Sequence, residues 1–80
     1  MFTLKFIKRF DDRVGDRTVI KTAESLTIIR DTDGAGVTMH RPGGDERVDV
    51  GFLDDRNPEG FDRVIIENAA GKTTEIISYA

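Results

Sequence analysis

Apolar and polar residues alternate along the opening segment of the chain, as they do in a β-strand with one buried face. Successive side chains of a strand point to opposite faces, so one face of residues 2–10 carries mostly apolar groups: Phe2, Leu4, Phe6 and Phe10, with Lys8 among them. The interval of four between the phenylalanines also suits a helix. The segment lacks a helix cap and is rich in residues that favour strands, so the pattern predicts a strand.

Short runs rich in Val, Ile and Thr recur along the rest of the chain, separated by clusters of Gly, Asp and Pro that favour turns. Residues 31–36 form one such predicted turn, and Pro42, Gly43, Gly44 and Asp45 predict a tight hairpin. A polar loop is expected over residues 54–60. Strands are predicted over residues 18–22, 26–30, 37–41, 48–52, 61–68 and 72–79, and the first two of these would alternatively form one strand broken near residues 23–25.

The last two predicted strands form a hairpin in which Gly71 takes the left-handed position of a three-residue loop. Apolar residues are consecutive at 64–66 and at 76–77. Such runs predict that both faces of these strands are covered, and that this hairpin lies at the centre of the fold. The residues predicted to be buried are Val48, Val50, Phe52, Val64, Ile66 and Ile76.

These elements predict an all-β fold with six or seven strands in a mainly antiparallel meander. A single flat sheet would leave one face in water and two edges open. We therefore expect the sheet to close as a small barrel or to fold over as a two-layer sandwich. With 80 residues, the chain is long enough for one small domain spanning residues 1–80 and too short for two.

Composition narrows the function classes. The chain has no cysteine, which excludes disulfides and thiolate metal sites. Charged residues interrupt the apolar ones at the start of the chain, so neither a signal peptide nor a membrane span is predicted, and a cytoplasmic protein without membrane association is expected. The net charge is −3, with six bases and three acids in residues 1–21 and six bases and twelve acids in residues 22–80.

No set of side chains has the spacing of a known catalytic or metal site, so we predict a protein that is not an enzyme and has no cofactor. Asp31, Asp33 and Gly34 resemble the start of a calcium loop, but the twelfth position, which needs a carboxylate, is Pro42. We interpret these aspartates as ordinary turn residues. His40, the only histidine, is predicted to be a surface or partly exposed strand residue opposite in face to Val37 and Met39.

The leading hypothesis is a non-catalytic protein–protein interaction or assembly module that docks on a partner protein, or on its own copy, through an edge strand or the basic first strand. The alternative is a nucleic-acid-binding small β-barrel, because bases interleaved with phenylalanines suit charge and stacking contacts. In a third interpretation the phenylalanines are core and the bases a solvated face. The candidate binding residues are Lys5, Lys8, Arg9, Arg13 and Arg17.

Overall fold

The computed structural model describes residues 1–9, 16–32, 34–51 and 61–78, and within them the fold is all-β, as predicted. These described residues form seven strands. Their bounds are β1 Phe2–Arg9, β2 Asp16–Ala23, β3 Ser25–Arg30, β4 Ala35–Arg41, β5 Gly44–Val50, β6 Arg63–Glu67 and β7 Thr73–Ser78. No helix in this part of the chain is long and apolar enough to cross a membrane.

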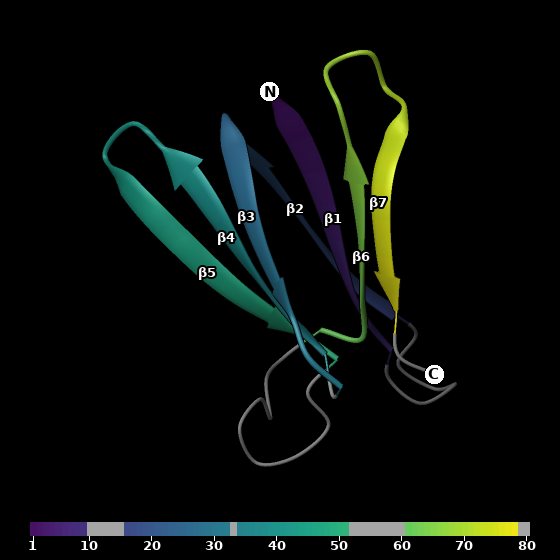
Figure 1. Cartoon of the computed structure of the whole chain (residues 1–80). Helices are drawn as coiled ribbons and strands as arrows, with labels where there is room; N and C mark the ends of the chain where they lie inside the picture. The colour runs from purple at the N-terminus through teal and green to yellow at the C-terminus, as the bar shows by residue number, and fades with distance from the viewer. Residues whose placement is uncertain (10–15, 33, 52–60, 79–80) are drawn as a thin grey trace.

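The strands form two antiparallel sheets that face each other as a sandwich (Figure 1). Sheet A has the order β2-β1-β6-β7, and sheet B has the order β3-β4-β5. The sheets do not close into a barrel, which decides between the two predicted arrangements in favour of the sandwich. Antiparallel hairpins join β1 to β2, β3 to β4, β4 to β5 and β6 to β7. Strands β2 and β3 lie in different sheets and β1 pairs with β6, so the chain is not one continuous meander.

Strand β1 holds sheet A together, since it pairs with β2 on one side and with β6 on the other. Its alternation has the predicted effect: Leu4 and Phe6 point into the sandwich and are fully buried, while Lys5 and Ile7 point outward. The Phe6 ring lies against Phe61, with ring centroids 5.4 Å apart. Phe10 lies outside the described residues.

The segment left open by the sequence consists of two strands, β2 and β3, separated by Glu24 alone. At this residue the chain passes from sheet A to sheet B, and the Glu24 N–H donates a hydrogen bond to the His40 carbonyl, 3.1 Å away. The turn predicted over residues 31–36 is shorter than expected. Ala35 and Gly36 belong to β4, because the carboxylate of Asp31 accepts the Gly34 N–H and tightens the turn before them.

Two of the predicted hairpins have the expected glycine geometry. Pro42 and Gly43 connect β4 to β5, with a φ of 98° at Gly43 and of 141° at Gly44, the first residue of β5. Gly71 has a φ of 80° in the β6–β7 turn. Asn68 stabilises the second turn, since its side-chain oxygen accepts the N–H groups of Ala70 and Lys72.

The two sheets share one apolar core, which includes Val37 and Met39 from β4 and Val64 and Ile66 from β6. Of the residues predicted to be buried, Val50, Val64 and Ile66 are fully buried and Val48 is half-buried. Phe52 and the side chain of Ile76 lie outside the described residues. The prediction that the last hairpin is central is correct for β6 and wrong for β7. Strand β7 pairs with β6 on one side and with no described strand on the other, so it forms an edge of sheet A.

Candidate functional site

The outer face of sheet A carries isoleucine side chains on three neighbouring strands. Ile20 of β2 and Ile65 of β6 both lie opposite Lys5 of β1, which places the three residues in one row across the sheet. Ile7 lies two residues further along β1 on the same face. Ile20 is 61% exposed, whereas Ile7 and Ile65 are partly buried. We call Ile7, Ile20 and Ile65 the isoleucine surface.

Strand β2 forms the edge of sheet A that borders the isoleucine surface. Arg41 covers one end of this edge, because its Nε donates a hydrogen bond of 2.7 Å to the backbone carbonyl of Thr22. Alternate residues of a strand direct their backbone groups to the same edge, so those of Thr18 and Ile20 point the same way as those of Thr22. Among the described residues, no strand pairs with β2 on this side.

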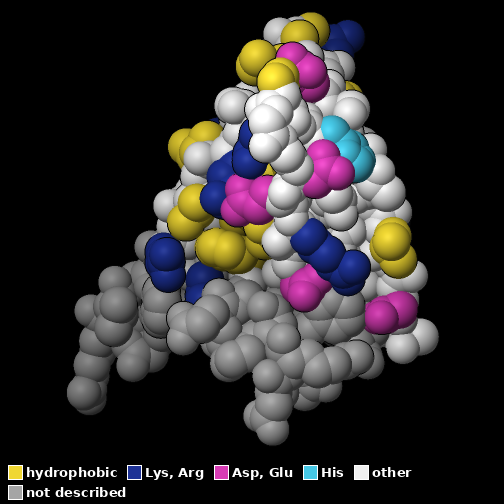
Figure 2. Space-filling view, turned by 90° about the vertical axis from the view of Figure 1, so that its left-hand side faces the viewer, with side chains coloured by type: hydrophobic (Ala, Val, Ile, Leu, Met, Phe, Trp, Pro, Cys, Tyr) yellow, Lys and Arg dark blue, Asp and Glu magenta, His cyan; other side chains and the backbone are white. Residues whose placement is uncertain are grey.

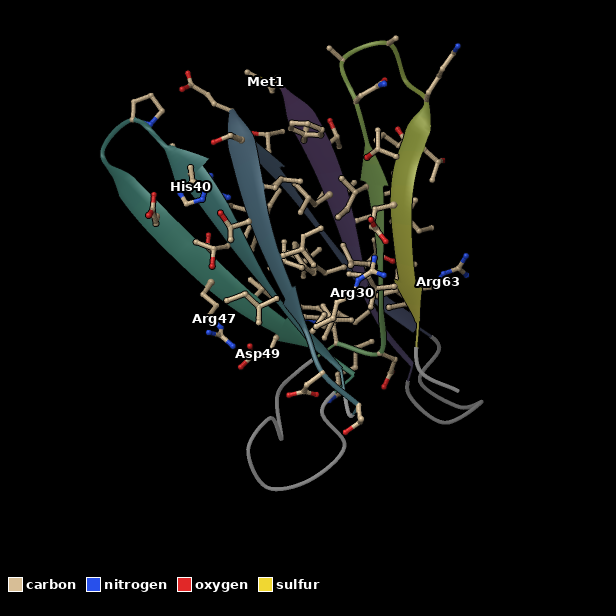
Figure 3. All side chains as sticks on the ribbon, viewed as in Figure 1. Met1, Arg30, His40, Arg47, Asp49 and Arg63 are labelled. Carbon is tan, nitrogen blue, oxygen red and sulfur yellow. The ribbon has the colours of Figure 1, made fainter. Side chains whose placement is uncertain are left out.

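Charged side chains join β2 to sheet B across the sandwich. Glu46 of β5 accepts hydrogen bonds from Arg41, at 2.8 Å, and from Lys21, at 2.9 Å. The hydrogen bond from Arg41, and to a lesser extent that from Lys21, lowers the pKa of Glu46 below its usual value. Figure 2 shows basic and acidic side chains in contact over this side of the molecule. Arg30 and Glu75 form an ion pair between β3 and β7, and Figure 3 shows Arg30 between those two strands.

The predicted binding residues do not all share one surface. Lys5 lies on the outer face of sheet A, in the isoleucine row. Lys8 and Arg17 oppose each other across β1 and β2, on the face that also carries Leu4 and Phe6. The side chain of Arg9, and all of Arg13, lie outside the described residues. The structure therefore brings Lys8 and Arg17 together and separates both from Lys5.

The outer face of sheet B holds a polar row on three strands. His40 of β4 lies between Thr27 of β3 and Asp45 of β5: its Nε2 is 2.7 Å from Thr27 Oγ1, and its Nδ1 is 3.0 Å from an Asp45 carboxylate oxygen. Figure 2 shows the histidine beside an acidic side chain at the surface. The prediction that His40 is a partly exposed strand residue on the face opposite to Val37 and Met39 is confirmed.

Arg47 lies flat on the same face because β4 has a glycine there. A Cβ atom on Gly36 would come within 2.6 Å of the Arg47 guanidinium, so the glycine leaves room for this side chain. Arg47 Nε donates to Asp49 at 3.0 Å, and Figure 3 shows the two side chains together beside β5.

The acidic turn after β3 is held by hydrogen bonds between Asp31 and Gly34. Asp31 Oδ1 accepts the Gly34 N–H at 3.2 Å, which is the turn chemistry predicted for it. Asp33 lies outside the described residues. No group of three or more histidine, aspartate or glutamate side chains that could hold a metal ion occurs in the part of the chain that the structure describes.

The sequence pattern did not point to Ile20 or Thr27, and it indicated Asp45 only as a turn residue. The contact between His40 and Asp45 could have been predicted from the sequence, because a tight turn at Pro42 and Gly43 places the two residues directly opposite each other. Thr27 required the register between β3 and β4, which are connected by a longer turn. Ile20 required knowledge that β2 is an edge strand, and this depends on the pairing of β1 with β6.

No model of a known protein family matches this chain, and neither a curated protein nor a solved structure does.

Proposed function

We propose that the protein is a non-catalytic protein–protein interaction module, and that an extended segment of a partner protein docks on the outer face of sheet A beside β2. The exposure of Ile20 carries this proposal. Its side chain is 61% exposed on an edge strand, in one row with Lys5 and Ile65. Complete burial of a fully exposed isoleucine is worth about 1.5–3 kcal/mol, and covering Ile20 contributes part of that because 61% of the residue is exposed.

The edge of β2 supports docking by strand addition. The backbone groups of Thr18 and Ile20 face outward, and an added strand would satisfy them with main-chain hydrogen bonds. The side chains of that strand would then extend the row formed by Ile20, Lys5 and Ile65. The Thr22 carbonyl already accepts a hydrogen bond from Arg41. The added strand therefore pairs with the first part of β2 and not with the C-terminal end near Thr22.

The charges on this face support a partner segment with acidic side chains. Among the residues whose side chains the structure describes, strands β1, β2 and β6 carry on the outer face of sheet A the bases Lys5 and Arg63 and one acid, Glu67. Complementary charges speed encounter and suppress wrong partners more than they add affinity. The partner segment therefore combines apolar side chains, which cover the isoleucine surface, with acidic ones near Lys5 and Arg63.

Capture of binding proteins from the lysate of the source organism tests this proposal, with and without nuclease. The tagged wild type is compared with Ile20→Lys and with the matched control Ile29→Lys, because Ile29 is 59% exposed on the outer face of sheet B. A defined protein that survives nuclease, is lost with Ile20→Lys and is retained with Ile29→Lys is the expected result. A captured second copy would identify self-association.

Two outcomes count against the proposal. Equal capture by both lysine variants would place the contact elsewhere. Recovery only of proteins that vanish with nuclease would favour the nucleic-acid hypothesis, for which Lys8 and Arg17 are the adjacent bases and whose affinity falls steeply with salt.

A further inference from the structure

The polar row on sheet B has the arrangement of an activated hydroxyl nucleophile. A nucleophile, a base within about 2.6–3.2 Å and a third group that orients the base are the parts of such a site. Thr27 Oγ1 lies 2.7 Å from His40 Nε2, and His40 Nδ1 lies 3.0 Å from Asp45 Oδ1, so both distances fall within this range. We propose that Thr27 is an acceptor site for an activated acyl group, with His40 as its base and Asp45 as the residue that positions His40.

With an ionised Asp45 and a neutral His40 ring, each hydrogen bond of the row has one direction. An ionised aspartate only accepts hydrogen bonds, so the His40 nitrogen that faces Asp45, Nδ1, carries the ring proton. The other nitrogen, Nε2, then has a free lone pair in the neutral ring and accepts the hydroxyl hydrogen of Thr27. The base is therefore already in contact with the proton that the reaction removes.

An acyl donor can reach Thr27 from solvent. The Thr27 side chain is exposed, and the face around it is the outer surface of sheet B. Thr38 is the directly opposite residue on β4, and it is partly buried. The Thr27 hydroxyl thus combines solvent access with a histidine partner.

The proposed step transfers an acyl group to one oxygen. Thr27 Oγ1 attacks the acyl carbonyl carbon while its proton passes to His40 Nε2. The bond between that carbon and the leaving group breaks, and the leaving group departs with the electron pair. The products are a threonine ester and an imidazolium, which Asp45 stabilises until the proton is released to solvent.

The donor has to be an activated ester or thioester. Backbone N–H groups within a sheet point along the ladder toward neighbouring strands, so they are not directed at an oxyanion that forms above the face. Without such donors an amide would react very slowly. We therefore expect a single acylation of Thr27 and not turnover, which is compatible with an interaction module, and the site lies on the opposite sheet from the isoleucine surface.

Acetylation by p-nitrophenyl acetate tests the proposal. The purified protein is treated with the ester, and peptide mass spectrometry locates acetyl groups, with hydroxylamine used to remove esters and to leave lysine amides intact. We expect a hydroxylamine-sensitive acetyl group on Thr27 in the wild type and in Thr27→Ser. Thr73→Val, a change at an exposed threonine of β7, is the matched control and should label Thr27 as the wild type does.

Three further variants decide the role of the row. Thr27→Val should carry no ester at this site, His40→Gln should slow the acetylation of Thr27 at least tenfold, and Asp45→Asn should slow it by a smaller factor. The side chains involved are at the surface, so the variants should fold, which circular dichroism checks. Absence of an ester on wild-type Thr27, or an unchanged rate in His40→Gln, would overturn the proposal.

Discussion

Gly36 and Gly71 occupy positions that favour glycine for different reasons. Gly36 has an ordinary strand conformation, and a Cβ there would meet the end of the Arg47 side chain at 2.6 Å. Gly71 has open space around it but a φ of +80°, which L side chains rarely adopt. The first glycine makes room for a neighbour, whereas the second provides a backbone conformation.

We predict that Gly36→Ala changes the free energy of unfolding by less than about 1 kcal/mol. The Arg47 side chain is flexible and swings aside, and alanine loses less chain entropy on folding than glycine. Gly71→Ala should cost roughly 1–2 kcal/mol, because the left-handed backbone strains an alanine. Urea unfolding of both variants measures the two values, and a larger cost for Gly36→Ala than for Gly71→Ala would contradict the expectation that the Arg47 side chain moves aside.

At the scale of elements, strand β6 has one buried face and one partly covered face. Ile66 is fully buried between the sheets, while its neighbour Ile65 points to the outer face of sheet A. A shift of one residue in the pairing of β6 would exchange the two. The difference in burial between Ile65 and Ile66 therefore depends on the register of β6.

We predict that Ile66→Val lowers the free energy of unfolding by about 0.5–1.5 kcal/mol, the usual cost of removing one buried methylene. Ile65→Val should stay within about 0.5 kcal/mol, as is typical of surface changes. Chemical denaturation of the two variants tests this order. If Ile65→Val proved the more harmful change, the register assigned to β6 would be wrong.

The elements were largely predictable from sequence because their signals are local. Alternation in residues 2–10 gave the buried side of β1, and the glycines at 43, 44 and 71 gave two hairpins. The pairing of β1 with β6 left no local signal, since it joins residues about sixty positions apart. The edge position of β2 depends on that pairing, and so does the exposure of Ile20, so the isoleucine surface could not be derived from the pattern alone.

At the scale of the whole molecule, ion pairs connect the two sheets on both sides of the sandwich. Glu46 binds Arg41 and Lys21 on one side, and Arg30 binds Glu75 on the other. The pKa of Glu46 is lowered from 4.5 in the folded protein by the hydrogen bonds from Arg41 and Lys21. Its contribution to stability is therefore fully present above about pH 4.5 and is lost as the pH falls through the lower, folded-state pKa.

We predict that Glu46→Gln is less stable than the wild type at pH 7, and that the difference disappears as the pH is lowered below 4.5. The loss should be about 1 kcal/mol or less, because the Glu46 side chain is 39% exposed and exposed ion pairs contribute little. Unfolding measured from pH 7 to pH 3 tests this, with Glu24→Gln, a change at an exposed residue, as the control. A difference that grew in acid would have the wrong sign.

The proposed interaction module contacts its partner through the outer face of sheet A. Photo-crosslinking in the lysate tests this contact, with p-benzoylphenylalanine introduced at position 20 in one variant and at position 29 in the other. We expect a discrete crosslinked protein from position 20, unchanged by nuclease, and none from position 29. Crosslinks of equal yield from both positions, or none from position 20, would contradict it.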